Sequence, residues 1–310
     1  MRILLTGGAG FVGFHLSGAL AARGHEVFIA DRFADRELDR FHLPLQLEHP
    51  ETIAAAVRAA MPQCIIHLAA QSSVSASWRD PDSTLETNIN GSVRLFQTMV
   101  KIVPGCRFVF IGSGEEYGAN CADSRLFDEG SECRPRNIYA VSKFSAGQIL
   151  ELLAAKYSVP LVHLRPFNHF GPHQREGFVI SDFCAQIARA EKGKGSRTIY
   201  TGNLAARRDF LYVEDVVCAY CMIVEAEQWP HPVYNISTGN VYSIQYILDF
   251  LISQANVQLQ TQIDPARFRP VEVPLLGANS LLMEQDFGWR PNHSLEDGLI
   301  KNLNWWREQV

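Results

Sequence analysis

The chain has 310 residues, of which 47% are hydrophobic and 20% charged, and its formal net charge is −5. This length and composition indicate a globular protein with one large domain or two interlocked ones. A net negative charge offers no general attraction to nucleic acid or to an anionic membrane, so we expect neither partner, and local basic residues must hold any anionic ligand.

The hydropathy and the spacing of the cysteines exclude further classes of protein. No apolar stretch reaches the length of a membrane span and Met1 leads directly into a short apolar run, so the sequence predicts a cytoplasmic protein without a signal peptide. The seven cysteines are irregularly spaced and odd in number, which does not fit a disulfide framework. Cys218 and Cys221 form one Cys-x-x-Cys pair within a helical pattern, and no second pair completes a zinc site, so we expect no metal.

The first thirteen residues, MRILLTGGAGFVG, predict a strand, a glycine-rich turn and a helix. Gly7, Gly10 and Gly13 follow the apolar run 2–6 at a three-residue spacing, which differs from the Gly-x-Gly-x-x-Gly of most dehydrogenases. Such glycines permit a tight turn and a close approach of the backbone to a pyrophosphate, and the helix N-terminus offers free N–H groups to the phosphates. We therefore predict a dinucleotide cofactor.

The identity of that cofactor depends on the end of the next predicted strand, residues 26–30. Asp31 follows this strand, about twenty residues after the glycines, where an acidic side chain accepts hydrogen bonds from a ribose 2′-OH. Asp31 repels a 2′-phosphate and so favours NAD, whereas Arg32 and Arg36 could pair with that phosphate. The sequence leaves NAD(H) and NADP(H) open.

Strands and helices alternate over the first 165 residues. Further strands are predicted at 43–47, 64–68, 107–111 and 159–165, and helices at 51–61, 83–101 and 139–157. This alternation predicts an α/β fold, a Rossmann-type doubly wound parallel sheet.

The pattern changes after Pro166, where prolines, glycines and aromatic residues alternate in a loop-like order. The remainder contains helical patterns at 180–191, 243–255 and 295–308 and a short strand at 233–236. We predict a dinucleotide-binding domain at 1–165 and a smaller, interleaved C-terminal α/β substrate domain at 166–310. Residues 207–227 are expected to return to the first domain.

Tyr139 and Lys143 lie four residues apart on a predicted helix and therefore share one face. A phenol with a pKa of about 10 is a poor acid or base at neutral pH, and a nearby ammonium group favours its ionised form. We expect Lys143 to lower the pKa of Tyr139. Ser113 follows the strand 107–111 and can bind the same substrate oxygen, so the three groups describe hydride transfer at a carbinol or carbonyl carbon.

The order of these motifs resembles that of the extended short-chain dehydrogenase/reductase family. HLAA at 67–70 and RDFLYVEDVV at 208–217 are also similar to family stretches, and the resemblance covers essentially the whole chain. It implies that Ser113, Tyr139 and Lys143 are catalytic and that Lys143 also binds the nicotinamide ribose. The implied cofactor-binding residues are Gly7, Gly10, Phe11, Val12, Gly13, Asp31, Arg32, Leu68, Ala69, Ala70, Tyr139 and Lys143.

A narrower resemblance points to the GDP-sugar branch of the family. It is carried by the runs GSGEEYG, RPFNHFGPHQREGFV, GNLAARRDF and RPVEVPLLGAN. The resemblance implies that Arg208 and Arg269 bind the diphosphate, as guanidinium groups do bidentately, and that Glu272 contacts the nucleotide or orients Arg269. From the residues alone, Arg208 could instead pair with Asp209. The implied substrate-binding residues are Ser113, Glu115, Asn168, Phe178, Val179, Asn203, Arg208, Arg269 and Glu272.

Glu115 bears on the choice of reaction. It stands two residues after Ser113, where sugar-nucleotide 4,6-dehydratases carry the glutamate that removes the C5 proton. Gly114 replaces the acid of many such enzymes, and the double glutamate 115–116 is more similar to the reductases. We therefore predict reduction of the C4 keto group of a GDP-4-keto-6-deoxyhexose, as in GDP-D-rhamnose synthesis.

Other functions remain open. The alternatives are GDP-mannose 4,6-dehydration, sugar-nucleotide 4-epimerisation, and a dinucleotide-binding sensor without catalysis; Glu115 could equally be a hydrogen-bonded carboxylate at a strand end. The helices 83–101 and 139–157 carry apolar stripes beyond what one sheet face requires. Family members often pair these helices, so the resemblance implies a homodimer.

Overall fold

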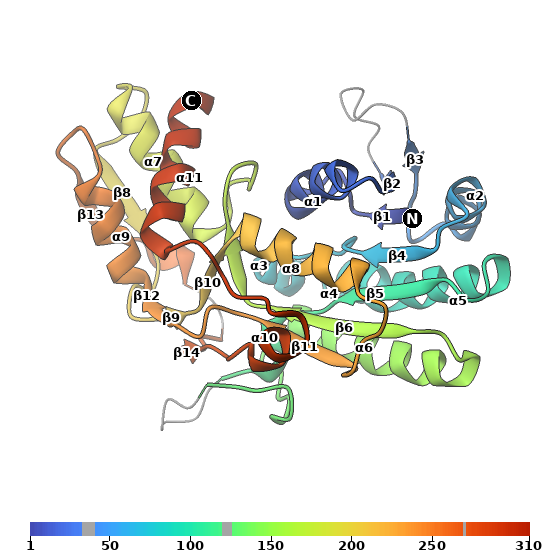
Figure 1. The fold of residues 1–310 in the computed structure, drawn as a ribbon. Helices are drawn as coiled ribbons and strands as arrows, with labels where there is room; N and C mark the ends of the chain where they lie inside the picture. Colours follow the sequence, from blue (N-terminus) through green and yellow to red (C-terminus); the bar gives the residue numbers. More distant parts are fainter. Residues whose placement is uncertain (33–40, 120–125, 269–270) are drawn as a thin grey trace.

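The centre of the molecule is a seven-stranded sheet in which every neighbouring pair of strands is parallel (Figure 1). The computed structural model describes residues 1–32, 41–119, 126–268 and 271–310. The strand order is β11 (Val233–Ile236), β6 (Leu161–Pro166), β5 (Arg107–Ile111), β4 (Cys64–His67), β1 (Arg2–Thr6), β2 (Glu26–Asp31) and β3 (His42–Pro44). The order reverses between β1 and β4, and ligands bind at the crevice that such a reversal opens. The predicted doubly wound parallel sheet is confirmed.

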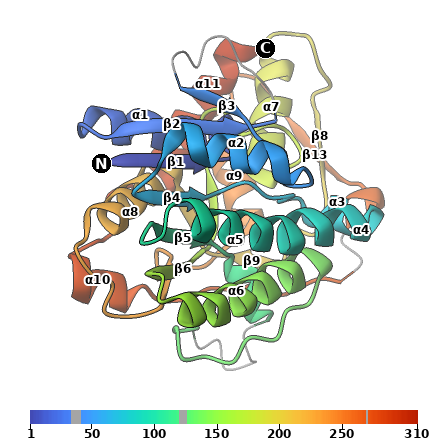
Figure 2. The same cartoon turned by 90° about the vertical axis from the view of Figure 1, so that its right-hand side faces the viewer.

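Helices cover both faces of the sheet, because alternate residues of each strand point to opposite layers. In β1, Ile3 and Leu5 belong to one apolar core and Leu4 belongs to the other. The first core is closed by α1 (Phe11–Ala22), α8 (Val213–Glu225) and α10 (Leu281–Phe287), and the second by α2 (Pro50–Ala60), α5 (Ser92–Ile102) and α6 (Ile138–Tyr157). Figure 2 shows α2, α5 and α6 side by side on one face. Burial on both faces explains why the strands are continuous apolar runs.

The helix predicted over residues 83–101 is present but irregular. Short α3 (Val74–Arg79) precedes it, and α4 (Pro81–Leu85), a π-helical turn (Glu86–Gly91) and α5 then follow one another without a break. In the π turn, the Asn88 side chain donates to the Gln71 carbonyl oxygen and to Ser142 Oγ and accepts the Gln71 N–H. These bonds tie the turn to the segment after β4 and to α6, so a side-chain network replaces regular helical hydrogen bonding there.

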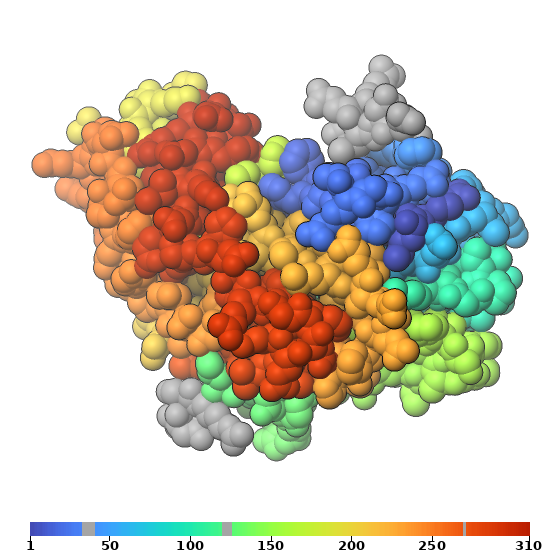
Figure 3. All heavy atoms as spheres, in the orientation of Figure 1, coloured from blue at the N-terminus to red at the C-terminus, as the bar shows by residue number. Residues whose placement is uncertain are grey.

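A second unit lies at the carboxyl edge of the sheet. Its apolar core is enclosed by α7 (Val179–Glu191), α9 (Ile244–Ser253) and α11 (Leu295–Gln309). Short strands surround it: β8 (Thr198–Thr201) pairs with β13 (Gln260–Ile263), β9 (Arg207–Arg208) with β12 (Tyr242–Ser243) and β14 (Leu275–Leu276), and β10 (Phe210–Tyr212) with β7 (Asn168–Phe170). In Figure 3 the C-terminal residues, in red, extend across both units.

The chain returns to the sheet unit within the predicted stretch 207–227, where α8 lies, and again at β11 and α10. The placement of residues 233–236 in the substrate region is wrong, because β11 pairs with β6 in the main sheet. Residues 207–212 form β9 and β10 outside that sheet, and α8 is the first returning element. Helix α10 packs against α8 and β11 and is also part of the sheet unit. The reason is that β6 is buried along its length and needs a strand on its outer side. The boundary between 165 and 166 stays a prediction.

Two kinds of feature are missing from the described part of the chain. Its helices lack the combination of length and apolar sequence that crossing a bilayer requires. Within the same residues, no three His, Cys, Asp or Glu side chains gather as metal ligands could. Cys218 and Cys221 both lie on α8, where Cys221 packs in the first core.

Candidate active site

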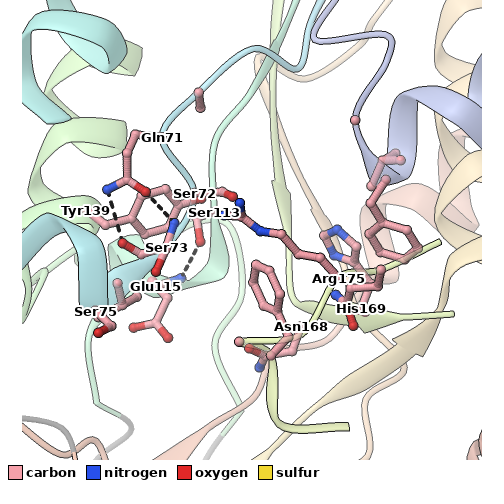
Figure 4. A pocket seen from close by; sticks show the side chains of 18 of the residues that line it. Gln71, Ser72, Ser73, Ser75, Ser113, Glu115, Tyr139, Asn168, His169 and Arg175 are labelled. Carbon is pink, nitrogen blue, oxygen red and sulfur yellow. Dashed lines mark hydrogen bonds between the residues drawn. The ribbon is translucent and has the colours of Figure 1, made fainter. Parts of the chain in front are cut away.

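A cavity of about 1190 Å³ lies between the carboxyl edge of the main sheet and the second unit. Its walls come from the β1–α1 turn, the ends of β4, β5 and β6, the start of α6 and the loop before α7. All the predicted site residues in the described ranges line this cavity, whereas Arg269 lies outside the described residues. Figure 4 shows Ser113, Glu115 and Tyr139 on one side, with Asn168 and His169 facing them.

The backbone of the glycine-rich turn is packed so closely that it leaves no room for side chains at Gly7 and Gly13. Gly7 has a φ of +72°, and a Cβ added there would lie 2.7 Å from the Ala69 backbone nitrogen. A Cβ on Gly13 would lie 2.5 Å from the Gly8 Cα atom, so α1 packs directly on the turn. No side chain among the described residues caps α1. Its first N–H groups, at Phe11 and Val12, therefore face the cavity at the positive end of the helix dipole, which fits a dinucleotide pyrophosphate.

Asp31 is fixed at the end of β2 beside this turn. Its Oδ2 atom accepts the Ala9 N–H at 3.2 Å and its Oδ1 atom accepts the Arg32 N–H at 2.7 Å. Both Asp31 and Arg32 line the cavity, and Arg36 lies outside the described residues. The carboxylate stands where a 2′-hydroxyl would bind and a guanidinium is its neighbour, so the geometry fits NAD(H) and NADP(H) alike.

Lys143 lies at the bottom of the cavity, on the face of α6 that meets the sheet. It is 3% exposed, and its Nζ atom donates to the Ile111 carbonyl oxygen at 2.7 Å. The ammonium also lies 5.2 Å from the centre of the Phe110 ring. Burial lowers the pKa of Lys143 to about 8, against the opposing effect of the Glu116 carboxylate. Lys143 is therefore charged at neutral pH but close to losing its proton.

The expectation that Lys143 lowers the pKa of Tyr139 is wrong for this structure. Burial raises the pKa of Tyr139 above its usual value, and a hydrogen bond with Ser113 opposes this only in part. The physical reason is that burial disfavours the phenolate and that the carboxylates of Glu116 and Glu115 repel it. The ammonium of Lys143 donates to the Ile111 carbonyl oxygen. The Tyr139 hydroxyl is protonated at neutral pH and is suited to donate a proton.

Ser113 caps a 3₁₀ turn, Gly114–Tyr117, that follows β5 and contains Glu115. Ser113 Oγ accepts the Glu115 N–H at 3.1 Å. Glu115 Oε2 accepts a hydrogen bond from Asn137 Nδ2 at 3.0 Å, and Asn137 caps α6 by accepting the Ala140 N–H. Glu115 therefore connects this turn to the helix that carries Tyr139, and its carboxylate still lines the cavity.

The substrate side contains a buried arginine. Arg208 is 5% exposed, and its guanidinium donates to Glu272 Oε1 at 3.2 Å and to the Arg207 carbonyl oxygen at 2.9 Å. The Asp209 carboxylate accepts N–H groups of Thr238 and Gly239, and the carboxylate that pairs with Arg208 is that of Glu272. The predicted contact of Glu272 with the nucleotide or with Arg269 stays a prediction.

The other predicted substrate residues reach the cavity from three separate segments. Asn168 donates to the Asp209 carbonyl oxygen at 3.2 Å, which fixes its amide. Phe178 and Val179 stand at the start of α7. Asn203 Oδ1 accepts the Ala205 N–H at 3.0 Å in the loop after β8. All four line the cavity, and their roles toward a substrate stay predictions.

Sequence reasoning missed several cavity residues. Gln71 accepts the Ser73 N–H at 2.6 Å and donates to Thr84 Oγ1, which shapes the wall after β4 (Figure 4). His169 and Arg175 line the opposite side. Small residues after β4 and the loop-like run after β6 did mark these segments, but no spacing rule indicates which of their side chains face inward.

The comparisons with known proteins agree with this geometry. The family described as GDP-mannose 4,6 dehydratase matches residues 4–302. GDP-6-deoxy-D-mannose reductase of Pseudomonas aeruginosa is 31% identical over 309 residues, which cover 100% of this chain and 98% of the relative.

Solved structures extend the likeness to the whole fold. The structure of RMD from Pseudomonas aeruginosa complexed with NADPH has a TM-score of 0.88 and 29% identity, with 100% of both chains covered. UDP-glucose 4-epimerase of Thermus thermophilus, in complex with NAD, has a TM-score of 0.89 and 28% identity, again over 100% of both chains.

Proposed function

The chain belongs to the GDP-mannose 4,6-dehydratase family of extended short-chain dehydrogenases/reductases, and from this premise we propose that it reduces the C4 keto group of a GDP-4-keto-6-deoxyhexose. Members of this family are NAD(P)-dependent enzymes that act on sugar nucleotides, and NAD(H) or NADP(H) is the cofactor. The product is the 6-deoxyhexose with a C4 hydroxyl, as in GDP-D-rhamnose.

The observation that carries the proposal is that Ser113, Tyr139 and Lys143 line one cavity in a chain that is 31% identical over its whole length to a GDP-6-deoxy-D-mannose reductase. Reduction of a ketone adds a hydride to carbon and a proton to oxygen, so the protein must supply an acid. Burial keeps the pKa of Tyr139 above its usual value, so its hydroxyl can supply that proton.

Each catalytic side chain has one task in this reaction. When bound, the nicotinamide ring supplies the hydride. Tyr139 donates its proton to the oxygen that becomes the C4 hydroxyl, and Ser113 Oγ holds that oxygen. Lys143 is an ammonium with three N–H donors; one binds the Ile111 carbonyl oxygen, and the others are suited to the ribose hydroxyls of the cofactor.

The nucleotide-sugar is held from the second unit. Arg208, fixed by Glu272 and by a backbone carbonyl, is preorganised to bind the diphosphate bidentately. Asn168, with its amide fixed by the Asp209 carbonyl oxygen, faces the sugar-diphosphate. Phe178 and Val179 flank the ligand at the start of α7, and Arg269 is proposed as a second cation for the diphosphate.

GDP-mannose 4,6-dehydration is the second candidate, because the Glu115 carboxylate lines the cavity two residues after Ser113. Glu115 accepts a hydrogen bond from Asn137 there. At Gly114, a Cβ atom would lie 2.8 Å from the ring of Phe167, so that position has no room for the acid that many other sugar-nucleotide dehydratases carry. The full-length similarity to a GDP-6-deoxy-D-mannose reductase favours reduction over dehydration.

A comparison of two substrates tests the proposal. The purified protein is incubated with GDP-mannose, and separately with GDP-4-keto-6-deoxymannose and NADH or NADPH, while nicotinamide absorbance and sugar products are followed. We expect cofactor oxidation with the keto sugar alone, one equivalent for each product formed. Loss of water from GDP-mannose without net cofactor consumption would instead establish the dehydratase.

A further inference from the structure

Beneath the catalytic turn lies a buried charged cluster for which the reaction described above has no role. Glu116 is 0% exposed and points away from the cavity, unlike its neighbour Glu115. Its Oε1 atom accepts a hydrogen bond from His163 Nε2 at 3.0 Å, and its Oε2 atom accepts one from Arg165 Nε at 2.9 Å. His163 is also 0% exposed, and Arg165 is 4% exposed. A carboxylate, an imidazole and a guanidinium are therefore almost fully removed from water.

Two glycines on different elements make room for this cluster. A Cβ atom on Gly112 would lie 2.2 Å from both Glu116 Oε1 and His163 Nε2. A Cβ atom on Gly147, in α6, would lie 2.4 Å from the His163 ring. Burying charges is costly unless each finds a partner, so a cluster accommodated at two backbone positions is not a packing accident.

The cluster reaches the catalytic groups through the backbone on either side of Gly112. Glu116 Oε1 accepts the Ser113 N–H at 2.8 Å, and Lys143 Nζ donates to the Ile111 carbonyl oxygen at 2.7 Å. Glu116 and Lys143 thus hold neighbouring peptide groups at the end of β5. The Glu116 charge also favours the charged form of Lys143 against the effect of burial.

We propose that Glu116 is a positioning residue of the active site, which together with His163 and Arg165 fixes the Ser113 backbone and keeps Lys143 charged from beneath the cavity. The part concerning Ser113 rests on the proposed reductase function. The part concerning Lys143 concerns only charges within the protein. Glu116 touches neither substrate nor cofactor and acts through these two residues.

The charges within the cluster determine whether it raises or lowers the pKa of Lys143. Burial disfavours ionisation of Glu116, but His163, Arg165 and the Ser113 N–H outweigh it, so the Glu116 pKa lies below its usual value. Burial alone would lower the pKa of His163, but Glu116 outweighs it and raises this pKa. A protonated His163 places a positive charge beside the Glu116 carboxylate, which should oppose the effect of that carboxylate on Lys143. Other titratable groups that interact with the cluster are Tyr139 and Glu151 of α6, Tyr117 of the turn, Glu129 and Cys133. His67 of β4 interacts with Lys143 itself.

The test compares the pKa of Lys143 in variants of the two paired residues, Glu116 and His163, which should shift it in opposite directions. Glu116→Gln removes the negative charge and should lower the pKa of Lys143 by about one unit, a tenfold change in its dissociation constant. His163→Gln keeps a donor toward Glu116 but removes the positive charge, so the pKa of Lys143 should rise. Without Glu116 the buried His163 loses the carboxylate that raises its pKa, so the double variant should give a Lys143 pKa close to that of Glu116→Gln alone.

The pKa is measured without any reaction. The full-length protein receives trace acetic anhydride between pH 6 and 11, and mass spectrometry of the Lys143 peptide gives the titration midpoint, expected near 8 in the parent. Binding of NADPH and thermal unfolding confirm that each variant is folded. If Glu116→Gln does not fold, His163→Gln alone must still move the midpoint upward. Shifts in the same direction, or no shift in folded variants, would overturn the proposal.

A pH profile of kcat/KM for keto-sugar reduction tests the part of the proposal that concerns catalysis. Its alkaline limb should follow the labelling midpoint in each variant, whereas a merely structural role would lower the rate without moving the limb. If the keto sugar is not reduced but the labelling shifts are opposite, the reductase function fails and the charge coupling stands. If reduction occurs and the labelling midpoints do not move, the coupling fails alone.

Discussion

The two sides of the cavity are built by different means. The cofactor side is made of backbone: glycines that cannot carry a Cβ atom, the first N–H groups of α1, and the ends of parallel strands. The substrate side is made of side chains from distant segments, such as Asn168, Arg208 and Glu272, held by pairs and single hydrogen bonds. A backbone site leaves a fixed spacing in the sequence, whereas a side-chain site can be changed without changing the fold. The cofactor class is therefore constrained by the fold and the substrate is not.

Removal of the Tyr139 hydroxyl should have the largest effect on activity. It should abolish most turnover without weakening cofactor binding. Tyr139→Phe removes the proton donor and leaves the glycine turn intact, so we expect kcat for keto-sugar reduction to fall by about 10²–10⁴-fold. The affinity for NADPH, measured by fluorescence titration, should change little. Substantial remaining turnover would show that another group donates the proton.

A side chain in the glycine turn should damage the cofactor side alone. In Gly13→Ala the new Cβ atom would meet the Gly8 backbone at 2.5 Å, which no rotamer change relieves. We expect a loss of about 1–3 kcal/mol of stability from overpacking, with much weaker NADPH binding. Gly18→Ala is the matched control, since a Cβ atom there meets nothing within 4 Å in the same helix. Equal losses in both variants would contradict the backbone account.

Changing the buried arginine should damage the substrate side alone. Arg208→Gln removes a bidentate partner for the diphosphate and leaves Glu272 without this cation, so KM for the GDP-sugar should rise by about 10–100-fold. The exposed neighbour provides the control, because Arg207→Gln should leave KM nearly unchanged. Steady-state kinetics at saturating NADPH distinguish the two. A rise in KM for NADPH rather than for the sugar would place Arg208 on the wrong side.

A charge change at the edge of the cofactor side should have a smaller effect. Asp31→Asn removes the carboxylate that would repel a 2′-phosphate, while an amide keeps part of its hydrogen bonding to the Ala9 and Arg32 N–H groups. We expect the ratio of kcat/KM for NADPH to that for NADH to rise severalfold. Kinetics with both cofactors measure this ratio. A shift toward NADH would show that Asp31 does not face the ribose.

The smallest effect on activity is expected from a change on the outer surface of α6, away from both sides of the cavity. Helix α6 exposes Val141 and Leu152, which is 74% exposed, and their separation along the helix, about three full turns, places both on one face. The predicted homodimer would bury this face. Sedimentation at micromolar concentration should show a dimer that Leu152→Glu shifts toward monomer, with kcat unchanged. A parent protein that sediments as a monomer would remove the prediction.

The sequence predicted the fold more completely than it predicted the electrostatics of the site. Periodicity located the strands of the sheet, and the glycine spacing and the Tyr139–Lys143 pair located the cavity, because both depend on local geometry. It failed where an effect depends on surroundings. The pKa of Tyr139 is set by burial and by carboxylates of another segment, and the partner of Arg208 is 64 positions away along the chain. The unit to which β11 belongs depends on its pairing with β6.

The fate of the cofactor hydrogen tests the central claim most directly. The protein is given GDP-4-keto-6-deoxymannose and NADPH deuterated at the transferable C4 position, and the sugar product is examined by mass spectrometry and NMR. Our account predicts one deuterium at C4 of the new 6-deoxyhexose and one oxidised cofactor per product. A sugar product without deuterium, or cofactor that keeps its label while GDP-mannose loses water, would contradict it.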